Sequence, residues 1–145
     1  MPAMRLALIV VFLTALVYSQ APSAVSRSSD LRAELVVVLN MSPANPLGGE
    51  IWLIDLNGIP VRRITKNNYH EEYPRFSPDG NRIVFVRNMG GLIPGVVIDP
   101  SQNEIFVYNL STGVETRLTH NNVEDSHPEW SYHGENIAFY SRRNH

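Results

Sequence analysis

The stretch Pro74-Arg-Phe-Ser-Pro-Asp-Gly-Asn-Arg-Ile-Val-Phe85 decides the fold of this 145-residue chain. It places Ser-Pro-Asp-Gly between two short runs that contain aromatic and β-branched residues. In such a turn the proline presets φ, and the glycine takes the left-handed position that follows. Apolar runs separated by turn residues are typical of antiparallel strands. The stretch therefore predicts a tight β-hairpin.

The same pattern returns in the second half of the chain, because positions 50–91 align without gaps onto positions 104–145. The later turn, Ser131-Tyr-His-Gly134, keeps the glycine and loses the proline and the aspartate. Twelve aligned positions are identical, and in the first copy they are Glu50, Ile51, Leu56, Arg63, Thr65, Asn67, Asn68, Pro74, Ser77, Gly80, Ile83 and Phe85. A match that preserves turn residues and apolar residues together indicates one supersecondary unit used twice.

Nine short strands follow from the apolar alternation inside and before these units. They group as three, four and two, with unit boundaries near residues 66–72 and 120–126. We expect them at Glu34–Leu39, Ile51–Leu56, Val61–Thr65, Tyr73–Phe76, Arg82–Arg87, Glu104–Leu110, Glu115–Thr119, His127–Trp130 and Asn136–Ser141.

The hairpin stretch and the segment Glu50-Ile-Trp-Leu-Ile-Asp55 resemble the TolB-like β-propeller repeat, an exported WD-like repeat. The second copy, Pro128-Glu-Trp-Ser-Tyr-His-Gly-Glu-Asn-Ile-Ala-Phe139, is similar to it as well, and the resemblance extends over residues 35–141. The motif residues have structural roles, and they are Pro74, Phe76, Ser77, Asp79, Gly80, Pro128, Trp130, Ser131 and Gly134.

The resemblance implies four-stranded blades with the Pro-x-Phe/Trp-Ser segment on the innermost strand. The expected fold class is therefore all-β, a partial β-propeller of antiparallel four-stranded blades preceded by a signal peptide helix. Whole propellers close with about four to eight blades, whereas nine strands make just over two. Three interpretations stay open: a fragment of a longer propeller, three copies closing a six-bladed ring with one strand too many in each, or an open stack or pairing with a separate propeller chain.

The N-terminal segment, positions 1–21, predicts export. Arg5 precedes an apolar run over residues 6–18, and the small residues Ser19 and Ala21 suit signal peptidase cleavage after Ala21. Cleavage after Ala24 and an uncleaved anchor are the alternatives. The run is short for a bilayer span, so we expect no stable membrane span after cleavage, a linker over residues 22–33, and propeller repeats over 34–145.

Composition excludes several classes of function. The formal net charge is −2 with no basic stripe, which argues against nucleic acid as a partner. The chain contains no cysteine, so disulfides are impossible. No Gly-x-Ser-x-Gly elbow and no His-Glu-x-x-His motif occurs, which favours binding over catalysis.

Long connections share one face of the expected fold, at residues 41–49, 66–72, 89–103 and 120–126, and loops of this kind on a rigid scaffold usually carry recognition. The candidate partner face comprises His70, Glu71, Glu72, His120, Glu124, Asp125 and His127. Imidazoles and carboxylates together could hold a divalent cation. Their spacing is unspecific, however, so we expect solvated loop residues and no cofactor.

The function predicted from the sequence is an exported module of the periplasm or cell envelope that binds a protein or peptide. The resemblance implies periplasmic TolB and stand-alone exported binding proteins as relatives. Two enzyme alternatives stay open. One is a metal-dependent lyase or hydrolase that uses His70, His120 and His127, and the other is the propeller part of a serine peptidase.

Overall fold

The computed structural model describes residues 35–39, 49–91 and 97–143, and its regular elements there are strands and one 3-10 turn. The expected signal peptide, the linker and the end of the chain lie outside the described residues. The elements are β1 (Leu35–Leu39), β2 (Glu50–Ile54), β3 (Pro60–Arg63), β4 (His70–Phe76), β5 (Arg82–Asn88), η1 (Pro100–Gln102), β6 (Asn103–Asn109), β7 (Glu115–Arg117), β8 (Asp125–Trp130) and β9 (Ile137–Ser141).

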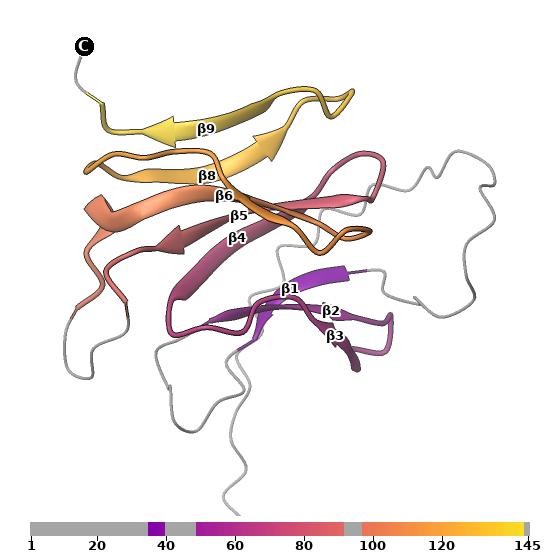
Figure 1. Cartoon of the computed structure of the whole chain (residues 1–145). Coiled ribbons are helices and arrows are strands. Elements are labelled where there is room, and N and C mark those ends of the chain that lie inside the picture. Colours follow the sequence, from indigo (N-terminus) through magenta and orange to yellow (C-terminus); the bar gives the residue numbers. More distant parts are fainter. Residues whose placement is uncertain (1–34, 40–48, 92–96, 144–145) are drawn as a thin grey trace, which may run out of the picture.

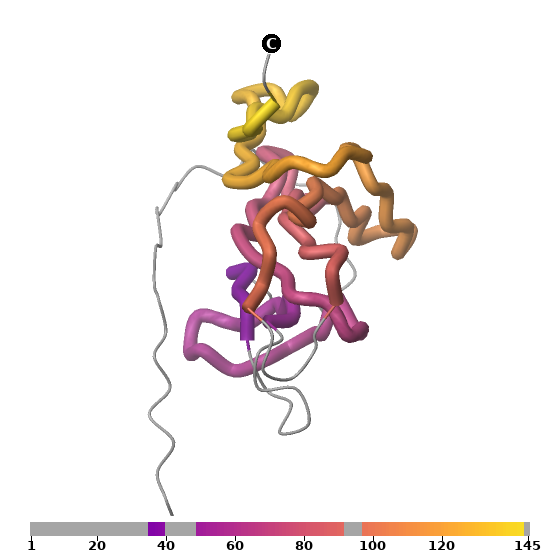
Figure 2. Tube along the Cα trace, turned by 90° about the vertical axis from the view of Figure 1, so that its left-hand side faces the viewer, coloured from indigo at the N-terminus to yellow at the C-terminus, as the bar shows by residue number. Residues whose placement is uncertain are grey.

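Three antiparallel sheets form in the order of the sequence. They are β1-β2-β3, β4-β5-β6-β7 and β8-β9. The four-stranded sheet lies between the other two (Figure 1), and a view turned by 90° shows the same order along the molecule (Figure 2). The expected all-β class, with its grouping of strands as three, four and two, is confirmed.

The sequence repeat coincides with equivalent strands, because β2, β3, β4 and β5 correspond in order to β6, β7, β8 and β9. Two inner strands begin earlier than expected, β4 at His70 rather than Tyr73 and β8 at Asp125 rather than His127. Their first residues are polar and precede a proline, so the apolar alternation that reveals the other strands is missing there.

The turn in the quoted stretch forms as its residues require. The Gly80 N–H donates to the Ser77 carbonyl at 2.8 Å, and Gly80 has a φ of 69°. Asp79 accepts hydrogen bonds from the Ser77 hydroxyl and from the Asn81 N–H, and the Ser77 bond is the main reason that the pKa of Asp79 is lowered. The second copy closes in the same way without the aspartate, with the Gly134 N–H 2.9 Å from the Ser131 carbonyl.

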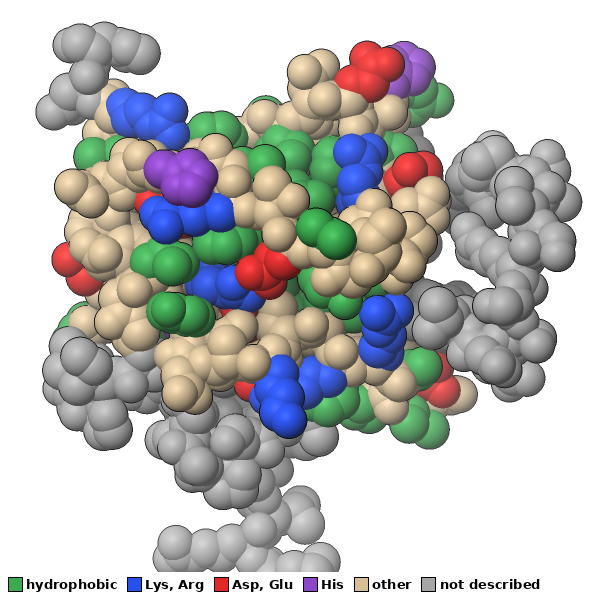
Figure 3. Space-filling model, viewed as in Figure 1, with side chains coloured by type: hydrophobic (Ala, Val, Ile, Leu, Met, Phe, Trp, Pro, Cys, Tyr) green, Lys and Arg blue, Asp and Glu red, His purple; other side chains and the backbone are tan. Residues whose placement is uncertain are grey.

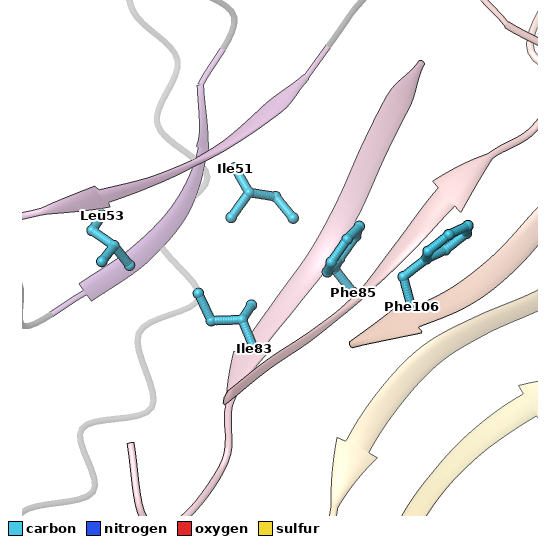
Figure 4. Packing of buried hydrophobic residues seen from close by; sticks show 5 residues of the cluster. All are labelled: Ile51, Leu53, Ile83, Phe85 and Phe106. Carbon is cyan, nitrogen blue, oxygen red and sulfur yellow. The ribbon is translucent and has the colours of Figure 1, made fainter. Parts of the chain in front are cut away.

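Apolar side chains gather between the sheets and on both faces of the middle one. Ile51 and Leu53 of β2 pack against the first of these faces, which carries Ile83, Phe85 and Phe106 (Figure 4). The opposite face carries three buried residues that meet Trp130 and Ile137 of the last sheet, and these are Val84, Val86 and Ile105. The middle sheet is thus buried on both faces, as stacked blades require.

The outer surface is mixed in character. On the face drawn in Figure 3, acidic and basic side chains are scattered among hydrophobic ones over all three sheets. Among the described residues, no helix has the length and apolar character needed to cross a membrane.

Candidate binding surface on the inner strands

The inner strands β4 and β8 carry the same backbone irregularity at equivalent positions. Tyr73 and His127 both have a φ of 51°, in the left-handed region that non-glycine residues seldom occupy. Each lies where the pairing register shifts, just before a proline that has no N–H for the ladder. Strained backbone of this kind clusters at functional sites, which draws attention to these two residues.

The two irregular residues meet across the blades. The rings of Tyr73 and His127 lie with centroids 4.1 Å apart at an interplanar angle of 32°. The next outward-facing pair also joins repeat-equivalent residues, because Arg75 Nε lies 2.8 Å from Glu129 Oε1. Trp130 Nε1 donates to the Arg75 carbonyl at 3.2 Å. The inner strands therefore lie side by side and present one surface.

A carboxylate lies near the ring pair from each repeat copy, Glu72 on β4 and Glu124 directly before β8. Glu72 Oε1 lies 2.8 Å from His70 Nε2, and Glu124 Oε2 lies 3.0 Å from Arg142 Nε. Burial raises the pKa of the Tyr73 hydroxyl, and the negative charges of Glu72 and Glu124 raise it further because they would repel a tyrosinate. Tyr73 therefore remains a neutral hydrogen-bonding group over the physiological pH range.

A hydrogen-bond chain sets the proton position on His127. The Ser126 hydroxyl donates its only proton to Glu124 Oε1 at 3.2 Å, so it accepts from His127 Nδ1, which lies 3.1 Å away. The neutral imidazole then carries its lone pair on Nε2. Because the His127 side chain is exposed, this nitrogen is available as a hydrogen-bond acceptor.

Four of the seven predicted face residues were expected in loops but lie on strands, and these are His70, Glu71, Glu72 and Asp125. Glu71 and Asp125 lie on β4 and β8, and each residue is 0% exposed. Glu71 accepts hydrogen bonds from Thr65 Oγ1 at 2.7 Å, Asn67 Nδ2 at 2.6 Å and Arg87 Nε at 2.8 Å. Both carboxylates lie on regularly paired residues ahead of the register shift, Glu71 opposite Arg87 and Asp125 opposite Ser141, and their side chains are enclosed within the fold.

The two buried carboxylates differ in their acidity. Burial raises the pKa of Glu71 despite its three hydrogen bonds. At Asp125 burial also acts to raise the pKa, but hydrogen bonds from Asn121 and Arg143 contribute to a net lowering. The Asn121 bond is 2.7 Å long and the Arg143 bond is 2.8 Å long.

The remaining predicted residues lie in different settings. His70, Glu72, Glu124 and His127 flank or form the ring pair, whereas His120 is exposed in the connection between β7 and β8. In the ranges that the structure describes, no three His, Asp or Glu side chains gather closely enough to hold a metal ion. The resulting inner-strand surface comprises Glu72, Tyr73, Glu124 and His127, and the buried Ser126 hydroxyl contacts the last two of these.

Sequence reasoning missed Tyr73 and Ser126. A signal for Tyr73 was present, because it aligns with His127 in the repeat and both residues precede the motif proline. Nothing local marks Ser126, whose role depends on the side chains that face it.

A shallow pocket adjoins this surface at the end of the molecule that holds the long connections. Its volume is about 210 Å³, and Asp99 and Ser101 line it together with the ion pair of Glu124 and Arg142. The connection between β5 and β6 and the connection before β8 thus lie together, as expected for loops that share a face.

Comparisons with known proteins find similarity among solved structures. No family model and no curated protein matches the chain. The solved structure described as "The structure of putative TolB from Agrobacterium tumefaciens" is similar to it, with 30% sequence identity and a TM-score of 0.47. The similarity covers 65% of this chain and 30% of that chain. This chain therefore spans about 30% of the length of the structure that it matches.

Proposed function

We propose that this protein is an exported, non-catalytic propeller module that binds a segment of another protein in the periplasm or cell envelope. The observation that carries the proposal is the contact between Tyr73 and His127, two repeat-equivalent residues with left-handed backbones on adjacent inner strands. Left-handed backbone at a non-glycine residue costs about 1–3 kcal/mol. The same unfavourable backbone conformation occurs at equivalent positions of both repeat copies. This repetition supports a functional role for the surface.

The chemistry of the inner-strand surface suits a hydrogen-bond donor. His127 Nε2 offers a lone pair, Glu72 and Glu124 offer carboxylate oxygens, and the Tyr73 ring offers an apolar face. A peptide segment supplies backbone N–H groups and a basic or aromatic side chain to match them. The sheet beneath is rigid, so little conformational entropy is lost when a partner binds.

The arrangement of Ser126 supports binding over hydrolysis. Its hydroxyl is buried and donates a hydrogen bond to Glu124, so the oxygen is not accessible to a substrate. A serine nucleophile needs an exposed oxygen and a base that takes its proton. His127 instead acts as donor to this hydroxyl, the reverse of the role that a general base fills.

Site-specific photo-cross-linking in the source cells tests the proposed surface. A benzophenone amino acid at position 127 should yield defined adducts with another protein, and Tyr73→Ala and Glu72→Gln should reduce their yield. Position 132 is the control, because Tyr132 is 80% exposed on the turn between β8 and β9. Equal adducts from positions 127 and 132, or none from position 127, would refute the proposal.

Export is tested separately by mass spectrometry of the protein from fractionated cells. We expect the mature protein in the periplasmic or extracellular fraction, with its N-terminus at Pro22 or Val25. A chain that retains Met1 and stays in the cytoplasm would contradict the proposed location.

A further inference from the structure

The shallow pocket beside the inner-strand surface combines an apolar wall with acidic groups. Pro100 and Val123 supply the wall, and Asp99 and Glu124 supply two carboxylates. The volume of the pocket is about 210 Å³, which is smaller than the volume of about 300–1,000 Å³ that is typical of sites for drug-sized ligands. The pocket therefore suits a single side chain better than a whole small molecule.

The chain around Asp99 holds this residue in place. The Asp99 carbonyl accepts hydrogen bonds from Asn88 Nδ2 at 2.7 Å and from the Gln102 N–H at 3.1 Å. Its Oδ1 accepts the Ser101 N–H at 3.0 Å, and no described residue donates a hydrogen bond to Oδ2. One oxygen of a fixed carboxylate is thus open to a ligand, and a group that is already fixed loses little conformational entropy on binding.

Glu124 already holds a cation that belongs to the chain itself. Its Oε2 lies 3.0 Å from Arg142 Nε, and the side chains of these two residues are 17% and 66% exposed. Arg142 Nε also donates to the Tyr140 hydroxyl at 3.2 Å. An ion pair with such an exposed member contributes little to stability, so a cation from a partner can displace the Arg142 guanidinium.

We propose that this pocket receives a lysine or arginine side chain of the protein segment that the inner-strand surface binds. The cationic head binds the carboxylates of Asp99 and Glu124. Its aliphatic stem packs along Pro100 and Val123, as the stems of long basic side chains do on apolar surfaces. Arg142 is then a stand-in that occupies Glu124 until a partner binds. The inference deepens the proposed function and rests on it for the nature of the partner.

Glu124 connects the pocket with the ring pair of Tyr73 and His127. It lines the pocket, and its negative charge contributes to raising the pKa of the Tyr73 hydroxyl. The Ser126 hydroxyl joins Glu124 to His127 through two hydrogen bonds. A segment that contacts the ring pair can therefore place a neighbouring side chain in the pocket.

The balance of charge favours a cation over an anion. Two carboxylates outnumber the single guanidinium, that of Arg142, in the described lining. The next residue, Arg143, lies 2.8 Å from the buried carboxylate of Asp125, which neutralises its charge. A lysine ammonium has three donors and no acceptor, so it can bond to Asp99 and Glu124 together, whereas an acidic side chain would be repelled by both.

An NMR titration of the purified protein with a blocked Gly-Lys-Gly peptide tests the chemistry of the pocket. The backbone amide signals of Ser101, Val123 and Glu124 should shift in a saturable way. Two comparison peptides have norleucine or glutamate in the central position, because norleucine keeps the stem without the charge and glutamate reverses the charge. Neither peptide should shift these signals.

Four variants test the roles of the charged groups. Asp99→Asn retains the cap of η1 and should weaken binding of the lysine peptide by about two- to fivefold, as expected for one exposed ion pair. Arg142→Gln should strengthen binding by a similar factor, because Glu124 loses its internal cation. Glu135→Gln and Lys66→Gln make the same changes of charge at exposed residues outside the pocket, and they should leave the affinity unchanged.

The outcomes distinguish this inference from the proposed function. Asp99→Asn should lower the yield of adducts from position 127, and Arg142→Gln should raise it. Adducts that form at position 127 and respond to neither variant would overturn the role of the pocket and leave the proposed surface in place. Lysine-peptide binding with the expected variant effects, but without adducts from position 127, would refute the surface and still support a pocket for a cation.

The titration by itself can also overturn the inference. No shift with the lysine peptide up to its solubility limit would do so, as would shifts with the glutamate peptide in its place. An Arg142→Gln variant that binds the lysine peptide no better than Lys66→Gln would show that Arg142 does not compete for Glu124.

Discussion

Thr65 and Thr119 show at the scale of single residues why the repeat keeps some polar positions. Thr65 Oγ1 accepts the Ile51 N–H at 2.8 Å, and Thr119 Oγ1 accepts the Ile105 N–H at 2.9 Å. Both hydroxyls are buried beside the end of a short outer strand. Each threonine thus extends the ladder of its sheet by one hydrogen bond where the strand stops supplying partners.

The two copies differ in what the threonine donates to. Thr65 donates to Glu71 Oε2 at 2.7 Å, whereas Thr119 donates to Glu104. The second copy has Asp125 at the position of Glu71, and its side chain is one methylene shorter. The shorter side chain accounts for the change of partner.

We predict that Thr65→Val lowers the free energy of unfolding by about 2 kcal/mol, because it leaves the buried Ile51 N–H without an acceptor. Thr65→Ser retains the hydroxyl and should cost less than about 1 kcal/mol. Urea denaturation followed by tryptophan fluorescence measures both. Thr116→Val, on the exposed part of β7, is the control, and a Thr65→Val variant as stable as that control would contradict the prediction.

Asp79 gives a prediction for pH dependence. The pKa of this carboxyl is lowered in the folded chain, chiefly by the Ser77 hydrogen bond, from an unfolded value of about 3.9. Its stabilising contribution is therefore present above about pH 4 and is lost as the pH falls through the lowered folded pKa. Asp79→Asn should cost less than about 1 kcal/mol at pH 7, because the group is exposed, and the cost should vanish in acid.

The second copy supplies a reciprocal variant for this measurement. His133 occupies the position of Asp79, and Ser131 retains the hydroxyl of Ser77. His133→Asp should therefore stabilise the chain at pH 7 and lose this effect in acid. A difference between Asp79→Asn and the parent that does not change with pH would rule out the proposed cause.

At the scale of the element, the inner strands are shaped by the residue before their proline. Tyr73 and His127 take a left-handed backbone, which shifts the pairing of β4 and β8 with their neighbours. A one-residue change of register turns a side chain to the other face of the sheet. This shift accompanies the inward position of Glu71 and Asp125 and the exposure of His127.

Two substitutions at position 127 isolate the backbone contribution. Both His127→Asn and His127→Val remove the ring contact with Tyr73, but asparagine tolerates the left-handed region and a β-branched residue does not. We expect the free energy of unfolding of His127→Val to be about 1–2 kcal/mol lower than that of His127→Asn. Equal stability of the two variants in thermal and urea denaturation would show that the backbone at this position relaxes.

At the scale of the whole molecule, stability centres on the middle sheet. It is the only sheet with described neighbours on both faces, and the side chains of β5 are almost fully enclosed. The Arg87 guanidinium joins the inner and outer strands of this sheet, with Nε 2.8 Å from Glu71 and its other nitrogens bonded to Glu115. Removal of one partner from a buried ion pair of this kind destabilises the fold, because it leaves the other charge buried without compensation.

The repeat provides a matched test of this distribution. Phe85 and Phe139 are the same residue at the same repeat position, but Phe85 is fully buried and Phe139 is partly exposed. Phe85→Ala should lower the free energy of unfolding by about 3–5 kcal/mol, and Phe139→Ala by about 1 kcal/mol. Equal losses would show that the last sheet is as well packed as the middle one.

The sequence by itself determined the strands, the turns and their repetition. Proline and glycine act within a few residues, as at Ser77–Gly80, and alternation of apolar residues reports burial one strand at a time. The bounds of β5 and β6 followed closely from such local signals. For the same reason the sequence placed His70, Glu72, Glu124 and His127 near one another without showing their contacts.

The tertiary structure alone decided which side chains face inward and which meet between blades. Glu71 is expected in a loop from the sequence, whereas in the fold it lies on β4 opposite Arg87 of β5 and accepts a hydrogen bond from the Arg87 guanidinium. The contact of Tyr73 with His127 joins residues of different repeat copies, far apart in the sequence, and it depends on how two sheets stack. Stacking is set by packing across an interface, and no local pattern encodes packing of that kind.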